Sequence, residues 1–325
     1  MANSGGFKKG FKTVFSFLKE VFSNFSDDKV LKFSASLSYY TIFSIAPILI
    51  IIISLAGYFF GREAVQGQIF SQINGLVGNE AAAQIQDMIG KTHKTGETLF
   101  ASIVSIVILI IGATGVFGEI QDSINTIWGL KSKPKTGIIK LIINRLISFS
   151  LIISLGFIAM VSLALNAAVE AITNILSQIV PGGGVIFISI LNYLLTFVIV
   201  TFMFAVIFKV LPDAKIKWRD VIKGAIVTAI LFIIGRSLIG LYVGKSNIAS
   251  VYGAAGSIVI ILVWVYYTAV ILYFGAEFTK IYSIKYGSKI TPNDYAVWVK
   301  VKEEEQPHQA LHEVKDEGAP RISNS

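Results

Sequence analysis

The pattern of hydrophobic and polar positions divides the chain into six long apolar runs that are joined by polar segments. Each run approaches or exceeds the roughly 20 residues that a helix needs to cross a bilayer. The runs lie at about 37–60, 99–117, 141–165, 185–208, 221–243 and 251–283. The sequence therefore predicts an all-α, polytopic membrane helix bundle with six transmembrane helices.

Shorter segments have the spacing of amphipathic helices. In residues 7–25 apolar side chains recur every three or four positions, and lysines lie off this stripe. The pattern indicates a helix on an anionic membrane surface or a helix packed on the protein's own cytoplasmic face. We expect two more interfacial helices in the loop 61–98, over the outer mouth of the bundle, and another at 117–128.

These patterns predict three parts of the chain. Residues 1–36 form a cytoplasmic amphipathic N-terminal helix, and residues 37–285 form the six-span membrane domain. Residues 286–325 are rich in acidic side chains and have no apolar periodicity. Such a composition is typical of a disordered segment, here a cytoplasmic tail.

Composition excludes an ordinary soluble protein. The chain is 54% hydrophobic with a mean hydropathy of +0.70 and only 15% charged residues, against about 25% charged in soluble domains. Cysteine is absent, so neither a disulfide nor a thiolate metal site is available. The net charge of +8 is explained by the cytoplasmic excess of Lys and Arg in membrane proteins, and no nucleic-acid partner is expected.

The distribution of Lys and Arg predicts the orientation of the bundle. These residues concentrate in the first terminus, in the loops after spans two and four, and at the start of the tail. The segments on the other side hold only Arg62, Lys91, Lys94 and Lys245. Both termini should therefore be cytoplasmic in a multi-pass protein of the bacterial inner (plasma) membrane.

Arg236 is the one charge well inside a predicted span. It lies about 22 Å along span five, which places it in the outer third of the bilayer. Ionisable residues at such depth are functional candidates, and its partners could be Asn166, Glu170 or an anionic substrate group. The alternative is that Arg236 reaches outward to the interface or forms a structural pair.

Glu277 lies at the inner end of span six, close to the predicted basic face. We expect a structural ion pair with Arg145, Lys209 or Lys223, and a proton or substrate relay is the alternative.

Oligomeric state is left open by the sequence.

Other candidates are aromatic or small. Tyr39 and Tyr40 could be interfacial anchors or cavity-lining residues, whereas Tyr266 and Tyr267 should direct their hydroxyls into the bundle. Pro47 should kink the first span and could act as a hinge. Close helix packing is expected at the small residues Gly240, Gly244, Gly253, Gly256 and Ser257.

Enzyme chemistry has little support in the sequence. The three histidines, His93, His308 and His312, lie in a loop and in the tail. No predicted span therefore offers a Ser–His pair or a His-ligated metal site. We expect no catalytic residues, no metal and no cofactor.

Three motifs carry a resemblance to a known family. Ser34–Pro47, the segment from Phe117 to Trp128, and Tyr252–Ser257 followed by Trp264–Tyr267 and Phe274–Phe278 resemble the motifs of the YihY/BrkB family. The resemblance covers roughly residues 7–285 and implies a six-span bacterial inner-membrane protein. This family was once labelled a transfer-RNA-processing ribonuclease, and some members virulence factors. Ser36 and Ser38 depart from its pattern, where alanine is expected.

The functional expectation is an envelope-related transporter, or a protein that handles lipids or small solutes, with an anionic substrate. Membrane lipids are its expected partners, and a polar path would be gated around Pro47 and the small face of span six. The alternative is a non-transporting scaffold for envelope assembly, and the ribonuclease label is disfavoured because the chain has no acid–base or metal constellation for it.

Overall fold

The structure is a computed structural model and describes residues 4–77, 79, 82–87, 112, 115–133, 184–245 and 256–299. Its longer helices are α1 (Ser4–Asp27), α2 (Val30–Phe60), α3 (Arg62–Val77), α7 (Gly184–Val210), α8 (Trp218–Lys245) and α10 (Gly256–Tyr286). Residues 82–87 and 115–127 are also helical. The strands are β1 (Leu130–Ser132), β2 (Ala214–Lys215), β3 (Thr291–Pro292) and β4 (Ala296–Trp298).

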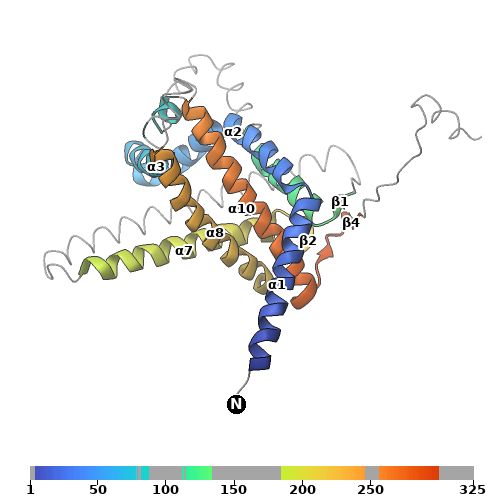
Figure 1. Cartoon of the computed structure of the whole chain (residues 1–325). Coiled ribbons are helices and arrows are strands. Elements are labelled where there is room, and N and C mark those ends of the chain that lie inside the picture. The colour runs from blue at the N-terminus through green and yellow to red at the C-terminus, as the bar shows by residue number, and fades with distance from the viewer. Residues whose placement is uncertain are drawn as a thin grey trace, which may run out of the picture.

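Helix α10 lies at the centre of the described bundle, between α2 and α8, as Figure 1 shows. Helix α7 packs on α8, and α3 contacts α2, α8 and α10. Helix α1 packs on α10 at the end where the chain enters α2. The carboxyl-terminal half of α10 contributes Leu272, Tyr273 and Ala276 to the main hydrophobic core. The last predicted span is therefore the helix around which the others pack.

Three described helices are long and apolar enough to cross a membrane, with windows at Tyr193–Val210, Trp218–Ile239 and Ile258–Tyr286. They coincide with predicted spans four, five and six. The first predicted span lies within one unbroken helix, α2. Predicted spans two and three lie outside the described residues, apart from 112 and 115–117. The helical architecture is confirmed, whereas the six spans and the cytoplasmic location of the termini stay predictions.

Two helix ends depend on backbone conformations that favour glycine. Helix α2 ends before Gly61, whose φ is +83°, and the helical segment 115–127 ends before Gly129, whose φ is +67°. A residue with positive φ commonly terminates a helix, and glycine adopts it at little cost. Lys29 separates α1 from α2 with a φ of +55°.

Helices α8 and α10 approach closely through a reciprocal Gly–Thr contact formed by Gly224, Thr228, Gly275 and Thr279. A methyl group added at Gly224 would lie 1.8 Å from Thr279 Oγ1, and one at Gly275 would lie 1.9 Å from Thr228 Oγ1. Each threonine hydroxyl donates to the glycine carbonyl one turn earlier in its own helix, at 2.7 Å in α8 and 2.6 Å in α10. Both hydroxyls are therefore satisfied without separating the two helices.

The structure adds two small sheets to the predicted all-α architecture. Strand β1 pairs with β4, and β2 pairs with β3, both antiparallel. The segment that follows α10 thereby contacts both the turn after residues 115–127 and the turn after α7. The description of this segment extends through Val299, and its backbone pairs with those turns. Residues 300–325 of the predicted tail lie outside the described residues.

Candidate functional site

The ends of several elements meet at one end of the bundle, which we call the polar end. It comprises the α1–α2 junction, the turns 128–133 and 211–217, and the segment 287–299. Sequence analysis assigns these segments to one side of the membrane on their Lys and Arg content, and the structure brings them together. Three buried carboxylates, Glu277, Asp220 and Asp213, lie among them.

Glu277 is fully buried near the carboxyl end of α10. Its Oε1 accepts from Lys280 Nζ at 3.2 Å, and the same Nζ lies 3.0 Å from Asp28 Oδ2. Glu277 Oε2 has no hydrogen-bond partner in the described part of the chain. Lys280 thus joins α10 to the α1–α2 junction, and a buried carboxylate is tolerated because a cation lies beside it.

The partners predicted for Glu277 differ from the observed partner. Lys209 Nζ donates to the Ile216 carbonyl, and Lys223 Nζ donates to the Tyr282 hydroxyl. Arg145 lies outside the described residues. The ion pair forms within α10 because Lys280 is three residues after Glu277, a spacing that brings side chains together on one helix face.

Asp220 is the second buried carboxylate, and it lies in the first turn of α8. Its Oδ2 accepts from the Ser288 amide at 2.7 Å, the Ser288 hydroxyl at 2.6 Å and the Ser283 hydroxyl at 3.4 Å. A carboxylate is also favoured at a helix amino terminus by the helix dipole. These bonds join the beginning of α8 to the end of α10 and the segment after it.

Asp213 is the third buried carboxylate and lies in the turn after α7. Gln121 Nε2 and Asn125 Nδ2 donate to its two carboxylate oxygens at 3.0 and 2.9 Å, and its amide donates to Asn125 Oδ1 at 2.8 Å. Its carbonyl accepts from the Asn293 amide at 2.9 Å. Tyr295 is 40% exposed, and its partial burial, together with the nearby Asp213 carboxylate, raises the pKa of its phenol.

The shared geometry of the three carboxylates indicates a structural role for the polar end. Each one joins segments that are distant in the sequence. Sequence analysis identified Glu277 but missed Asp213 and Asp220. Gln121 and Asn125, on the polar side of residues 117–128, could have indicated a partner such as Asp213. If the polar side of an amphipathic helix is buried, its side chains need hydrogen-bond partners from another segment.

Arg236 lies in α8 near the opposite end from the carboxylates, and its side chain is exposed. Ile230, Ile234 and Leu238 of α8 are also exposed, but at 100° per residue they lie about 120–160° around the helix from Arg236. Within the described ranges no ion pair involves Arg236, and its predicted partners Asn166 and Glu170 lie outside them. The structure therefore places an exposed guanidinium inside a candidate span.

Tyr267 lies close to Arg236 in the fold. A methyl group added at Gly235, the residue before Arg236, would lie 1.7 Å from the Tyr267 hydroxyl oxygen. The Tyr267 hydroxyl thus contacts the α8 backbone beside the arginine. Tyr266 and Tyr267 are both half-buried. Tyr267 thus meets α8 at the residue before Arg236, whose own side chain is exposed.

Tyr39 and Tyr40 lie elsewhere, on the exposed surface of α2. Their ring centroids are 6.1 Å apart, and Tyr39 also lies 5.1 Å from Phe43. This exposed aromatic group fits the predicted interfacial anchors. Helix α2 continues through Pro47 without a break, and the side chain of Pro47 is outside the description.

The predicted packing glycines are described only in part. Gly256 is buried at the first turn of α10. Gly240 and Gly244 lie within α8, and Ser257 within α10, but their surroundings lie outside the description, as does Gly253 altogether. Among the described glycines within helices, the close contacts with another helix are instead at Gly224, Gly235 and Gly275.

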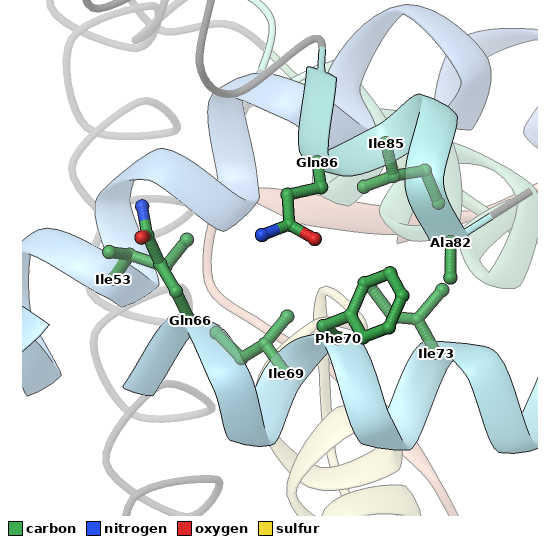
Figure 2. A pocket seen from close by; sticks show the side chains of 8 residues that line it. All are labelled: Ile53, Gln66, Ile69, Phe70, Ile73, Ala82, Ile85 and Gln86. Carbon is green, nitrogen blue, oxygen red and sulfur yellow. The ribbon is translucent and has the colours of Figure 1, made fainter. Parts of the chain in front are cut away.

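A small apolar pocket lies between α2, α3 and the helical segment 82–87. Figure 2 shows Ile69, Phe70 and Ile73 of α3 facing Ala82 and Ile85, with the amide of Gln86 directed toward the interior. Ile53 and Gln66 complete the lining. Ile53, Ile69, Ile73 and Ile85 also pack in one cluster with Ile239, which lies one turn after Arg236 in α8.

No group of three His, Asp or Glu side chains is placed to hold a metal ion among the described residues. What the described elements define is a helical membrane protein with a polar end, and with an apolar pocket and an exposed arginine toward the other end.

The chain matches the family described as Virulence factor BrkB over residues 21–296, and it belongs to that family. It is 27% identical to a UPF0761 membrane protein of Psychromonas ingrahamii over 278 residues, covering 82% of this chain and 88% of the relative. It is 25% identical to the ribonuclease-like protein YfkH of Bacillus subtilis, covering 81% and 93%.

A further relative is the UPF0761 membrane protein Smlt0865 of Stenotrophomonas maltophilia, which is 26% identical. That alignment covers 81% of this chain but only 59% of the relative. No solved structure matches this chain. The family assignment and the apolar helices together establish a membrane protein.

Proposed function

We propose that this protein is an envelope-related transporter, or a lipid- or solute-handling protein, that binds an anionic substrate near the outer end of the bundle. The proposed setting is the bacterial inner membrane, crossed six times, with both termini in the cytoplasm. The observation that carries the proposal is Arg236, an exposed cation inside a candidate span.

Charge supports an anionic substrate. A charged side chain within a membrane span is costly unless it meets water, an opposite charge or a headgroup. No described carboxylate pairs with Arg236, so a phosphate or carboxylate group of a ligand would supply the missing charge. A guanidinium binds such groups through paired hydrogen bonds.

The surroundings of Arg236 support a substrate with an apolar part. Ile239, one turn after the arginine, packs in the same cluster as residues that line the apolar pocket in Figure 2. Binding sites for small ligands are typically apolar with a few polar groups that fix orientation. An anionic amphiphile, with a charged headgroup and an acyl chain, matches this combination.

We also propose that the protein is not an enzyme. The name of the Bacillus relative suggests a ribonuclease, but the three buried carboxylates of this chain are engaged in contacts that join helices and turns. The support is this structural use of the acidic groups, and purified protein should leave RNA intact under conditions where it is folded.

The proposal is tested with full-length protein in vesicles that contain a fluorescent anionic phospholipid or, in a parallel sample, a zwitterionic one. A membrane-impermeant quencher measures how fast the labelled lipid moves between leaflets, and loaded radiolabelled phosphate measures solute flux. We expect faster movement of an anionic species than in protein-free vesicles, with a smaller effect on the zwitterionic lipid. Equal rates with and without protein for every species would contradict the proposal and favour the scaffold.

A further inference from the structure

Helix α1 has an apolar surface of which only one part contacts the protein. Phe17 and Val21 are buried against α10 and pack with Ile281. The ring of Phe17 lies 5.1 Å from that of Phe278 in an edge-to-face arrangement. This contact anchors α1 to the carboxyl-terminal end of α10.

The rest of the apolar surface of α1 is exposed. Val14, Phe15 and Phe22 are 58%, 63% and 60% exposed, and Leu18 is 38% exposed. At 100° per residue, these four side chains fall within about 100° of the helix circumference, next to the sector that contains Phe17 and Val21. Helix α1 thus presents a continuous apolar sector that its own fold leaves mostly exposed, and within it only the edge at Phe22 has a ring contact with α10, 5.3 Å from Phe274.

Basic residues border this sector on its far side. Lys12 and Lys19 are exposed, and their helical positions lie beyond Phe15, away from the contact with α10. Glu20 lies on the other side, where its carboxylate pairs with Lys285 of α10. The exposed sector is therefore bordered by cations, whereas the nearby carboxylate is already engaged within the protein.

The position of α1 along α10 places this sector near a membrane surface. The candidate span of α10 has 29 residues, or ~43 Å of helix at 1.5 Å per residue, against a hydrocarbon core of about 30 Å. Its last turns, where Phe17 lies close to Phe278 and Tyr286, therefore extend into the headgroup region. Figure 1 shows the first half of α1 continuing beyond this end of α10.

We propose that α1 is a membrane-surface helix whose sector Val14, Phe15, Leu18 and Phe22 inserts between the headgroups of an anionic leaflet. Lys12 and Lys19 bind the acidic headgroups, and Phe17 and Val21 hold the helix on α10. Apolar burial combined with attraction to anionic lipid is the general mode of such helices. A second copy of the chain is less favoured, because its own lysines would be brought against these lysines.

The absence of cysteine permits a direct test with single nitroxide labels in otherwise unchanged protein. Labels are attached at F15C, L18C and F22C, and the matched controls are the exposed neighbouring positions S16C and S23C. The measurement uses vesicles with acidic phospholipid. Frequent collisions of the nitroxide with oxygen report that the label is in lipid, and frequent collisions with a polar nickel complex report that it is in water.

We expect collisions with oxygen to dominate at positions 15, 18 and 22, and collisions with the nickel complex to dominate at positions 16 and 23. Omitting acidic lipid, or combining Lys12→Gln with Lys19→Gln, should reduce the preference for oxygen at position 18. A preference for nickel at all five positions would overturn the proposal in favour of a water-exposed helix. Dipolar broadening between labels at position 18, diluted away by unlabelled protein, would overturn it in favour of a second copy.

Discussion

The reciprocal Gly–Thr contact makes the spacing between α8 and α10 testable with one methyl group. In Gly275→Ala the new Cβ would lie 1.9 Å from Thr228 Oγ1, 2.9 Å from Thr228 Cβ and 3.0 Å from Phe208 Cζ. Ordinary contacts between such atoms are about 3.5 Å or more. The helices must therefore separate, and α8 and α10 would lose contact along the centre of the bundle.

The magnitude follows from two opposing effects. Overpacking of a well-packed interior typically costs about 1–3 kcal/mol, whereas replacing glycine by alanine within a helix gains up to about 1 kcal/mol in helix propensity. Gly118→Ala is the matched control, because a methyl group at Gly118 would have nothing within 4 Å. The propensity gain is common to both variants, so we expect Gly275→Ala to be about 1–3 kcal/mol less stable than Gly118→Ala.

The assay is unfolding of the purified protein in one detergent, followed by tryptophan fluorescence. A second variant, Gly275→Ala combined with Thr228→Ala, removes the atom that the methyl group meets at 1.9 Å. Because the two positions share one contact, the double variant should lose less stability than the two single variants together. Equal stability of Gly275→Ala and Gly118→Ala, or simple additivity in the double variant, would refute the close approach of these helices.

Two further predictions concern the polar end. Lys280→Met leaves the Glu277 carboxylate buried without its cation, and we expect a loss of about 3–5 kcal/mol in the free energy of unfolding. Adding Glu277→Gln should recover most of this loss; no recovery would show that Lys280 stabilises the fold without Glu277, for example through Asp28. The raised pKa of Tyr295 means that its contribution to stability is present below about pH 10 and is lost as the pH rises through the raised value. A difference absorbance titration of the wild type against Tyr295→Phe should show a phenol that ionises above the ordinary tyrosine range. A transition at or below that range would contradict its partial burial beside Asp213.

Long apolar runs and regular spacing are the features that the sequence revealed well. The runs at 185–208, 221–243 and 251–283 correspond to helices α7, α8 and α10, and the stripe in residues 7–25 corresponds to α1. These features are local, because a helix places residues three and four apart on one side whatever lies around it. The carboxylate Glu277 was visible for the same reason, as a charge beside an apolar run.

Contacts between distant segments could not be predicted in the same way. Asp213 meets Asn125 across 88 positions of sequence, and a two-residue strand such as β2 is too short to show alternation. Gly224 and Gly275 resemble every other glycine in an apolar helix until the facing threonine is known. For Arg236 the sequence predicted depth in the membrane, whereas its exposure and its proximity to Tyr267 depend on how α8 meets α10.

The most direct test of the proposed function is the movement of an anionic lipid in vesicles that contain Arg236→Gln. The matched control is Ser237→Ala, an exposed neighbour whose hydroxyl only donates to the Ile233 carbonyl of its own helix. We predict that Arg236→Gln loses most of the protein-dependent movement of the anionic lipid, that Arg236→Lys retains part of it, and that Ser237→Ala retains all of it. Undiminished movement in folded Arg236→Gln protein would contradict the assignment of Arg236 as the anion-binding residue.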